Sequence, residues 1–291
     1  MRNEQPGYFP RGASVLRRVH GARIVGVLYG QRALLMQATH PLAFAGLTAN
    51  TQGLNAPFAR LAHTAKTMER VFFGSREEAD RETARVRALH DRVRGAIPEP
   101  AGPYPAGSGY TATDPEFLLW ILACIADSAL AVYELFVRRL TDREREGFWQ
   151  DYLRVGELFA LPRDHAPSSY PGFRAYMRER LSSSDLFVTD QARELGLKVA
   201  FDLPVPDHRR PALAVINFAV LGSLPDRVRE AYGLGWSVAQ RGAFGALVLT
   251  LRGGAVITPA RVRRGSSARD YDLVARTEAQ RLGRAGAARA H

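Results

Sequence analysis

The sequence predicts an all-α protein with little or no β-sheet. Three Ser/Thr-x-x-Glu capping boxes, each a typical helix start, precede long segments of helical periodicity. These boxes are Ser75 with Glu78, Thr113 with Glu116, and Thr141 with Glu144. Strand signals are few, because β-branched runs such as Val199-Ala200-Phe201 have no alternating partner nearby. We therefore expect helices packed around one core.

The expected helices follow in chain order. They are Ala13–Met36, Phe58–Phe72, Ser75–Ile97, the segments after Thr113 and Thr141, Gly172–Leu181, Thr189–Leu195, Arg209–Leu221, Pro225–Tyr232 and Val238–Arg252. Pro115 suits the first turn of its helix, where an amide has no intrahelical partner. The proline-rich segment 98–105 is short enough to be a loop.

Length and composition indicate one domain. The chain has 291 residues and 46% hydrophobic side chains, enough to bury a large core. We expect a single helical domain over residues 1–291, with 261–291 a basic C-terminal extension. Cys124, the single cysteine, excludes an internal disulfide and a cysteine-rich zinc site, and its apolar neighbours predict a buried, inert thiol.

The formal net charge of +11 raises the question of whether the protein binds nucleic acid. Only Lys66 and Lys198 are lysines, and the arginines alternate with acids in residues 76–82 and 141–146, as on solvated helix faces. We predict no nucleic-acid partner. The basic tail from Arg261 to His291 is the exception: it suits contact with a membrane surface or an acidic partner, or is a loosely ordered or helical end.

The first residues lack the apolar core of a secretory signal, and no run of about 18 to 20 uninterrupted apolar residues occurs. We expect a cytoplasmic chain without a transmembrane segment.

His90 stands where helical periodicity calls for an apolar side chain. Ala79, Thr83, Val86 and Val93 recur with it at spacings of three and four, which predicts a core-facing stripe. A buried imidazole needs partners for both nitrogens. A metal ion or haem iron is one kind of partner, and a carboxylate or backbone group is the other.

Arg60 and Thr64 lie one helical turn apart and can act on the same ligand. The alternative is a capped helix start with a surface arginine. His63 lies about 60° from Arg60 around the helix, so a role for it needs a second buried face. His40 precedes Pro41 and either lines a pocket, holding a cofactor edge, or has a structural role in the turn.

Several motifs, in their order and separation, resemble the rubber oxygenase (latex-clearing protein) and MpaB-type oxygenase family. They are Gln37-Ala38-Thr39-His40-Pro41, Arg60-Leu61-Ala62-His63-Thr64, Phe72-Phe73-Gly74, His90 with Val93-Arg94-Gly95, Tyr110-Thr111-Ala112-Thr113-Asp114-Pro115, Trp120, and the run Asp127 to Phe136. The similarity extends from about Arg32 to about Arg261.

The resemblance implies an all-helical protein that holds haem b. His90 is the position similar to the proximal iron ligand, and Arg60 and Thr64 match the Arg-x-x-x-Thr pair beside the haem. For a bound haem, the guanidinium suits a propionate or dioxygen, and the hydroxyl suits the distal oxygen. His63 replaces the lysine that can occupy the distal side, and Leu122 stands where many members have a second histidine. Leu122 cannot coordinate iron or transfer protons.

The expected function is that of a haem b-dependent oxygenase. With dioxygen or a peroxide, it would oxidise a hydrophobic, isoprenoid-like small molecule, with cleavage of a carbon–carbon double bond as the favoured outcome. His90 would bind the iron, and His63, Arg60, Thr64 and His40 would contact the cofactor.

Two alternatives remain open. One is a haem-binding sensor or carrier without turnover, and the other is a cofactor-free interaction protein in which His90 is held by Asp127. The remaining histidines, His20, His165, His208 and His291, are expected to be solvated or locally hydrogen-bonded.

Overall fold

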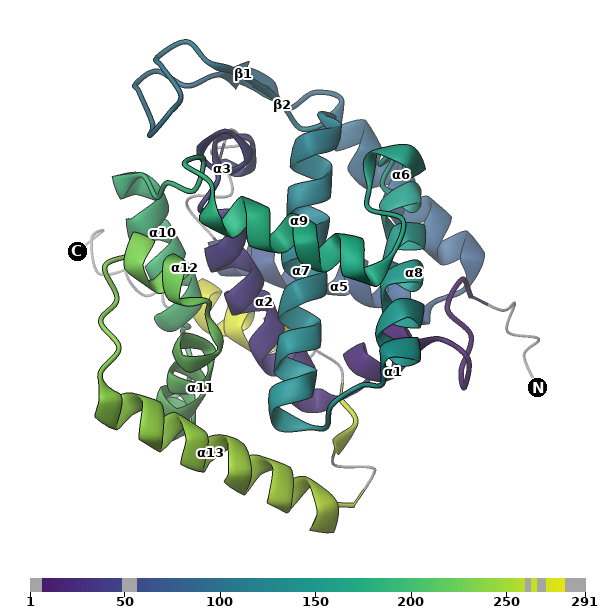
Figure 1. The fold of residues 1–291 in the computed structure, drawn as a ribbon, viewed down its shortest axis with the longest axis vertical. Helices are drawn as coiled ribbons and strands as arrows, with labels where there is room; N and C mark the ends of the chain where they lie inside the picture. The colour runs from purple at the N-terminus through teal and green to yellow at the C-terminus, as the bar shows by residue number, and fades with distance from the viewer. Residues whose placement is uncertain (1–6, 49–56, 260–262, 266–270, 281–291) are drawn as a thin grey trace.

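The helices of this protein pack around a central pair, α2 and α7, which contact each other more extensively than any other two described elements (Figure 1). The structure is a computed structural model and describes residues 7–48, 57–259, 263–265 and 271–280. The predicted all-α class is confirmed, since only two three-residue strands accompany the described helices.

The helices that carry or surround the central pair are α1 (Val15–His20), α2 (Arg23–Gln37), α3 (Pro41–Thr48), α5 (Pro57–Phe73), α6 (Arg76–His90), α7 (Pro115–Phe136) and α8 (Asp142–Leu158). The C-terminal half adds α9 (Tyr170–Ser182), α10 (Asp190–Phe201), α11 (Arg210–Ser223), α12 (Asp226–Ala231) and α13 (Val238–Ile257), and residues 271–280 are also helical.

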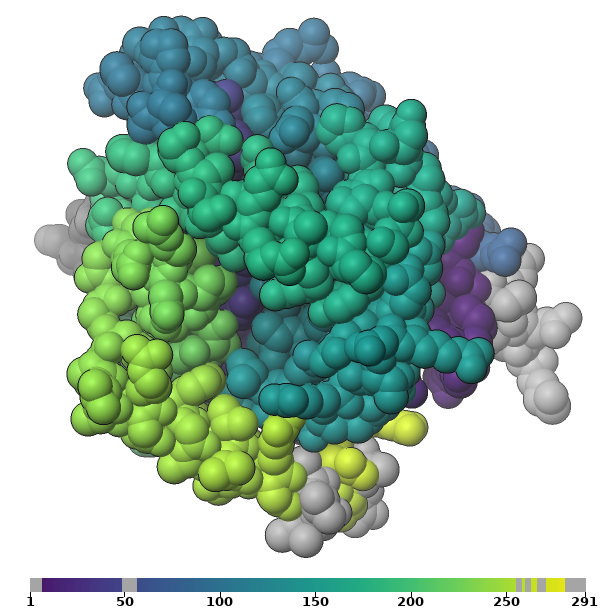
Figure 2. Space-filling model, viewed as in Figure 1, coloured from purple at the N-terminus to yellow at the C-terminus, as the bar shows by residue number. Residues whose placement is uncertain are grey.

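The apolar sequence of α7 explains its central position. Of the described helices, α7 alone is long and apolar enough to cross a membrane by length and composition, and 67% of its most apolar 18-residue window is buried inside the protein. Little of α2 is visible in the space-filling view, because neighbouring helices cover it (Figure 2). Burial against protein is what a core helix requires.

A buried charged cluster joins the two central helices. The Arg32 guanidinium on α2 pairs with the Asp127 carboxylate on α7 at 2.9 Å and donates to the Ser128 hydroxyl at 2.8 Å and the Ser223 carbonyl at 3.0 Å. Arg174 from α9 contacts the other Asp127 oxygen at 2.6 Å. A buried carboxylate is tolerated because both of its oxygens are paired.

Two of the predicted helices, Ala13–Met36 and Ser75–Ile97, are wrong in their boundaries, because the backbone changes direction within each of them. The expected helix Ala13–Met36 is two helices, because the chain leaves α1 at Gly21 and is extended at Ala22. The expected helix Ser75–Ile97 ends at His90, and residues 94–96 instead form β1. Residues 94–96 pair with residues 109–111, and helical periodicity does not contain that pairing.

The capping boxes are mostly confirmed. Ser75 and Thr141 each accept a hydrogen bond from the amide three residues on and receive the reciprocal glutamate bond. The box of Thr113 with Glu116 is wrong: the N-cap of α7 is Asp114, whose carboxylate accepts from the Glu116 amide at 2.8 Å. Pro115 at the first helical position favours this start.

The two strands form a small hairpin at the end of the molecule opposite α13 (Figure 1). β1 (Arg94–Ala96) pairs antiparallel with β2 (Gly109–Thr111), and Gly95 stands opposite Tyr110. An apolar cluster of Leu42, Ile97 and Ala101, with Tyr110 packed on it, connects the hairpin to α3.

Candidate functional site

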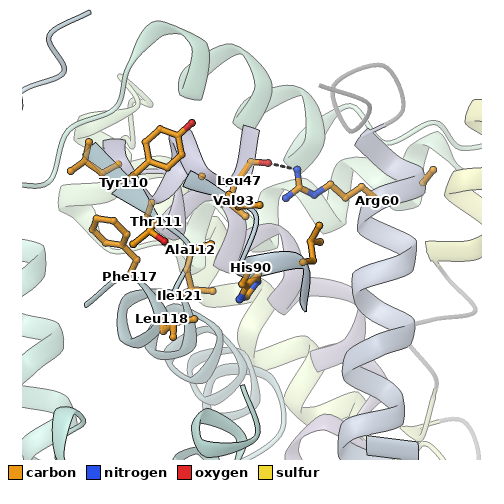
Figure 3. A pocket seen from close by; sticks show the side chains of 15 residues that line it. Leu47, Arg60, His90, Val93, Tyr110, Thr111, Ala112, Phe117, Leu118 and Ile121 are labelled. Carbon is orange, nitrogen blue, oxygen red and sulfur yellow. Dashed lines mark hydrogen bonds between the residues drawn. The ribbon is translucent and has the colours of Figure 1, made fainter. Parts of the chain in front are cut away.

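A cavity of about 460 Å³ lies between α3, the start of α5, the end of α6, the hairpin and the first turns of α7. This volume is within the range of about 300 to 1,000 Å³ typical of small-molecule sites. Its lining is mainly apolar, and comprises Leu42, Ala43, Gly46, Leu47, Ala59, Arg60, Leu89, His90, Val93, Tyr110, Thr111, Ala112, Phe117, Leu118 and Ile121. Arg60 and Tyr110 lie on opposite sides of it in Figure 3.

His90 is the last residue of α6 and lines this cavity. Its ring is half-buried and makes no side-chain hydrogen bond within the part of the chain that the structure describes. Burial lowers the pKa of His90, although the neighbouring Asp91 carboxylate acts in the opposite direction. The neutral imidazole that burial favours is the form that binds a metal ion.

Arg60, in the first turns of α5, is the cationic group of the cavity wall. Its guanidinium donates to the carbonyl oxygen of Leu47, near the end of α3. The last carbonyls of a helix have no intrahelical donor, so this bond joins α5 to α3. An arginine in this position suits an anionic group of a ligand, because the guanidinium has several N–H donors in a fixed plane.

The other two candidates on α5 lie outside the lining of the cavity. The Thr64 hydroxyl is exposed and donates to the Arg60 carbonyl at 3.1 Å, one turn back along the helix. His63 is also exposed. Their proposed contacts with a cofactor stay predictions, and of the Arg-x-x-x-Thr pair the structure brings only Arg60 to the cavity with His90.

His40 is buried beside the cavity but does not line it. Its Nδ1 accepts from the Ala43 amide at 3.4 Å, at the start of α3, and its Nε2 lies 3.3 Å from the Tyr104 hydroxyl. Burial lowers its pKa to about 4, so the ring is neutral at pH 7. These contacts match the structural role in the turn, while the predicted contact with a cofactor stays a prediction.

The expectation that Asp127 holds His90 is wrong, because the Asp127 carboxylate is bound by Arg32 and Arg174. The expectation for His20 is also wrong. His20 is buried, its Nε2 lies 2.6 Å from the Tyr152 hydroxyl 132 residues away, and burial lowers its pKa to about 3. Neither partner could be identified from spacing along the chain.

The apolar wall of the cavity includes residues that sequence reasoning did not select. Phe117, Leu118 and Ile121 come from one face of α7, and Val93 and Tyr110 come from the hairpin. The segment around Tyr110 contributed to the family resemblance, but nothing in its local pattern indicates a cavity wall. Leu122 is buried and lies outside the lining, so the missing histidine of this position does not change the wall itself.

No group of three or more His, Cys, Asp or Glu side chains among the described residues is arranged to hold a metal ion. A metal ion held by protein side chains alone typically needs three or four ligands. A porphyrin supplies four nitrogen ligands itself and needs one protein ligand, such as an imidazole.

Comparison with known proteins gives a family and two relatives. The family model described as ER-bound oxygenase mpaB/B'/Rubber oxygenase, catalytic domain, matches residues 17–253. Two uncharacterized proteins, one from Mycobacterium bovis and one from Mycobacterium tuberculosis, are each 27% identical over 199 residues, which cover 67% of this chain and 74% of the relative. No solved structure matches the chain significantly.

The matched region contains the whole cavity, from Leu42 on α3 to Ile121 on α7. The helical fold, the apolar cavity and the family match agree with the resemblance read from the motifs, and the chain belongs to the mpaB/B'/rubber oxygenase catalytic-domain family of oxygenases.

Proposed function

We propose that this protein is a haem b-dependent oxygenase that oxidises a hydrophobic, isoprenoid-like small molecule with dioxygen. Membership of an oxygenase family supports the reaction class. The single observation that carries the haem assignment is His90: a neutral imidazole on the wall of an apolar cavity, with no protein partner for its ring in the described chain.

The chemistry of the residues in the cavity wall supports a haem. His90 would be the protein ligand to the iron, and Arg60 would face a propionate from the rim of the same cavity. Leu118, Ile121 and Phe117 would contact the apolar faces of the macrocycle. When bound, haem supplies the iron that reacts with dioxygen, which no side chain can do alone.

The chain itself contributes binding, orientation and exclusion of water. His90 is the last residue of α6, and this position places it on the wall of the cavity. Arg60 is fixed by its bond to the Leu47 carbonyl, so its charge stays at the rim. The apolar side chains of α3 and α7 exclude water and select a hydrophobic ligand.

The test is the visible spectrum of purified His90→Ala protein. We expect the wild-type protein, expressed with a haem precursor, to show a Soret band, and the variant to lose at least nine-tenths of it while its far-UV circular dichroism is unchanged. His165→Ala is the matched control, because His165 is an exposed histidine outside the cavity and should retain the full band.

A colourless wild-type protein, or full haem retention in His90→Ala, would refute the assignment. Carbon monoxide binding to the ferrous protein separates oxygenase from the non-catalytic sensor or carrier. A ferrous protein that binds neither carbon monoxide nor dioxygen supports the sensor or carrier.

A further inference from the structure

Helix α13 is apolar on its outer face as well as on the face that packs against the core. The side chains that turn inward and contact the main apolar cluster are Phe244, Leu247, Val248 and Leu251. At about 100° per residue, the middle of the outer face spans about 80° of the helix and consists of Val238, Gly242, Gly245, Leu249 and Gly253. A helix that is apolar all round is normally buried, whereas α13 lies along one edge of the molecule (Figure 1).

No described residue covers this outer face. Val238 is 86% exposed and Leu249 is 71% exposed, the two largest fractions among the large apolar side chains of the described chain. A Cβ atom added at Gly242, Gly245 or Gly253 would meet no other atom within 4 Å. An exposed row of apolar residues with open space in front of it is typical of an interaction surface.

The exposed apolar surface continues onto α11. Val215 is 50% exposed and stands one turn before Phe218, whose ring centre lies 6.3 Å from that of Phe244 on α13. Trp236, which comes just before α13, packs on both rings. Residues three apart share a helix face, so Val215 lies on the side of α11 that faces α13. We call the outer face of α13 together with Val215 the α13 surface.

The charged residues around the α13 surface are basic. No Asp or Glu stands between Glu230 and Asp270, whereas this part of the sequence contains six arginines. Arg241 is exposed at one border of the outer face, and Arg263 and Arg264, beyond the end of α13, are exposed as well. An apolar row with a cationic border complements a lipid bilayer whose headgroups are anionic.

A second copy of the chain and a nucleic acid complement this surface less well. Two α13 surfaces brought together in a symmetric dimer would each contribute arginines and no acid, so that like charges would oppose each other. A nucleic-acid backbone presents phosphates and sugars, which offer no apolar layer in which Val238 and Leu249 could be buried.

We propose that the α13 surface docks the protein peripherally on a lipid bilayer that carries anionic headgroups. Val215, Val238 and Leu249 enter the boundary between the headgroups and the acyl chains, and Arg241 contacts headgroup phosphates. The inference is independent of the proposed function, because the hairpin that borders the cavity lies at the end of the molecule opposite α13 (Figure 1).

The experiment is sedimentation of the purified full-length protein with increasing amounts of lipid vesicles. One set of vesicles is phosphatidylcholine alone, and the other is an equal mixture of phosphatidylcholine and phosphatidylglycerol. We expect the wild-type protein to bind the anionic vesicles at least about tenfold more tightly than the neutral ones. Added salt should weaken this binding, because it screens exposed charges.

Two variants, each with a matched control, separate the apolar and the charged contribution. Leu249→Ala should lower the affinity for anionic vesicles by at least about tenfold, because it removes three apolar carbon atoms from the docked row. Phe187→Ala, at an exposed apolar residue outside the α13 surface, should keep the wild-type affinity. Arg241→Gln should weaken binding about fivefold. Arg227→Gln, at an arginine of α12 that is 66% exposed, should leave it nearly unchanged.

Equal binding of the wild-type protein to neutral and anionic vesicles, or binding to neither, would overturn the proposal, as would equal affinities of wild type and Leu249→Ala. Light scattering without lipid tests the second copy. A wild-type dimer that becomes a monomer in Leu249→Ala, with no binding to vesicles, would assign the α13 surface to self-association and refute docking on lipid. The thermal midpoint of each variant shows whether the fold is preserved, and the Soret band of the same samples tests the haem assignment separately.

Discussion

Removal of the Asp127 carboxylate would leave a buried arginine without its counter-charge. The Arg32 side chain is 4% exposed and the Asp127 side chain 8% exposed, so solvent reaches neither group. Breaking a buried ion pair by removing one partner costs about 3 to 5 kcal/mol. Arg32 would keep its bonds to Ser128 and Ser223, which places the expected cost of Asp127→Ala near the lower end of that range.

The second partner of Asp127 contributes less to this cost. Arg174 is 38% exposed, so its guanidinium can turn to water when the carboxylate is absent. We therefore expect Arg174→Ala to cost about 1 kcal/mol or less. Arg32→Ala should resemble Asp127→Ala, since it leaves the carboxylate buried with only one arginine.

The assay is equilibrium urea unfolding followed by far-UV circular dichroism. Asp127→Ala should lower the urea midpoint without a change in slope, by an amount equivalent to about 3 kcal/mol. The matched control is Asp207→Ala, which removes an ion pair whose Arg210 and Asp207 side chains are 68% and 87% exposed, and which should cost less than about 1 kcal/mol.

The same variant also distinguishes a structural from a functional role for Asp127. We expect folded Asp127→Ala to hold as much haem per molecule as the wild type, because the carboxylate contacts arginines and not His90. The reasoning would be refuted by a loss of stability below about 1 kcal/mol, or by loss of haem at unchanged stability.

Two further predictions concern a helix start and the response to acid. Asp114→Ala should lower the free energy of unfolding by about 1 kcal/mol, whereas Thr113→Ala should change it far less, because Asp114 caps α7; equal losses in urea unfolding would contradict this. His20 has a pKa of about 3 in the folded protein against 6.5 in the unfolded chain. Between these pH values the unfolded state binds the extra proton. The free energy of unfolding therefore decreases as the pH is lowered below 6.5, by up to about 1.4 kcal/mol per pH unit. His20→Asn should reduce this slope in urea titrations from pH 7 to pH 5, and a flat wild-type profile would rule out the buried neutral His20.

Local signals in the sequence predicted most of the helices. Ser75 and Thr141 cap the starts of α6 and α8, as the Ser/Thr-x-x-Glu pattern predicts. The α5 prediction, Phe58–Phe72, differs from the observed Pro57–Phe73 by one residue at each end. Caps and periodicity act within a few residues, so they can be read without knowledge of the tertiary structure.

The site could be predicted only in part. The motifs identified the family and drew attention to Arg60 and His90, which the structure brings to one cavity. They did not reveal that Thr64 bonds back to its own helix or that His40 caps the start of α3. A helical repeat shows which residues share a face, but not which neighbouring element covers that face.

The sequence by itself therefore determined the fold class and the family, whereas the core-facing stripe expected through His90 is wrong beyond this residue, because α6 ends there. Only the tertiary structure decided which partners the polar groups have: Asp127 with Arg32, and His20 with Tyr152. The physical reason is the distance along the chain over which each kind of interaction acts. Helix formation depends on interactions between near neighbours in the chain, whereas the partner of a buried polar group depends on how helices far apart in sequence pack together.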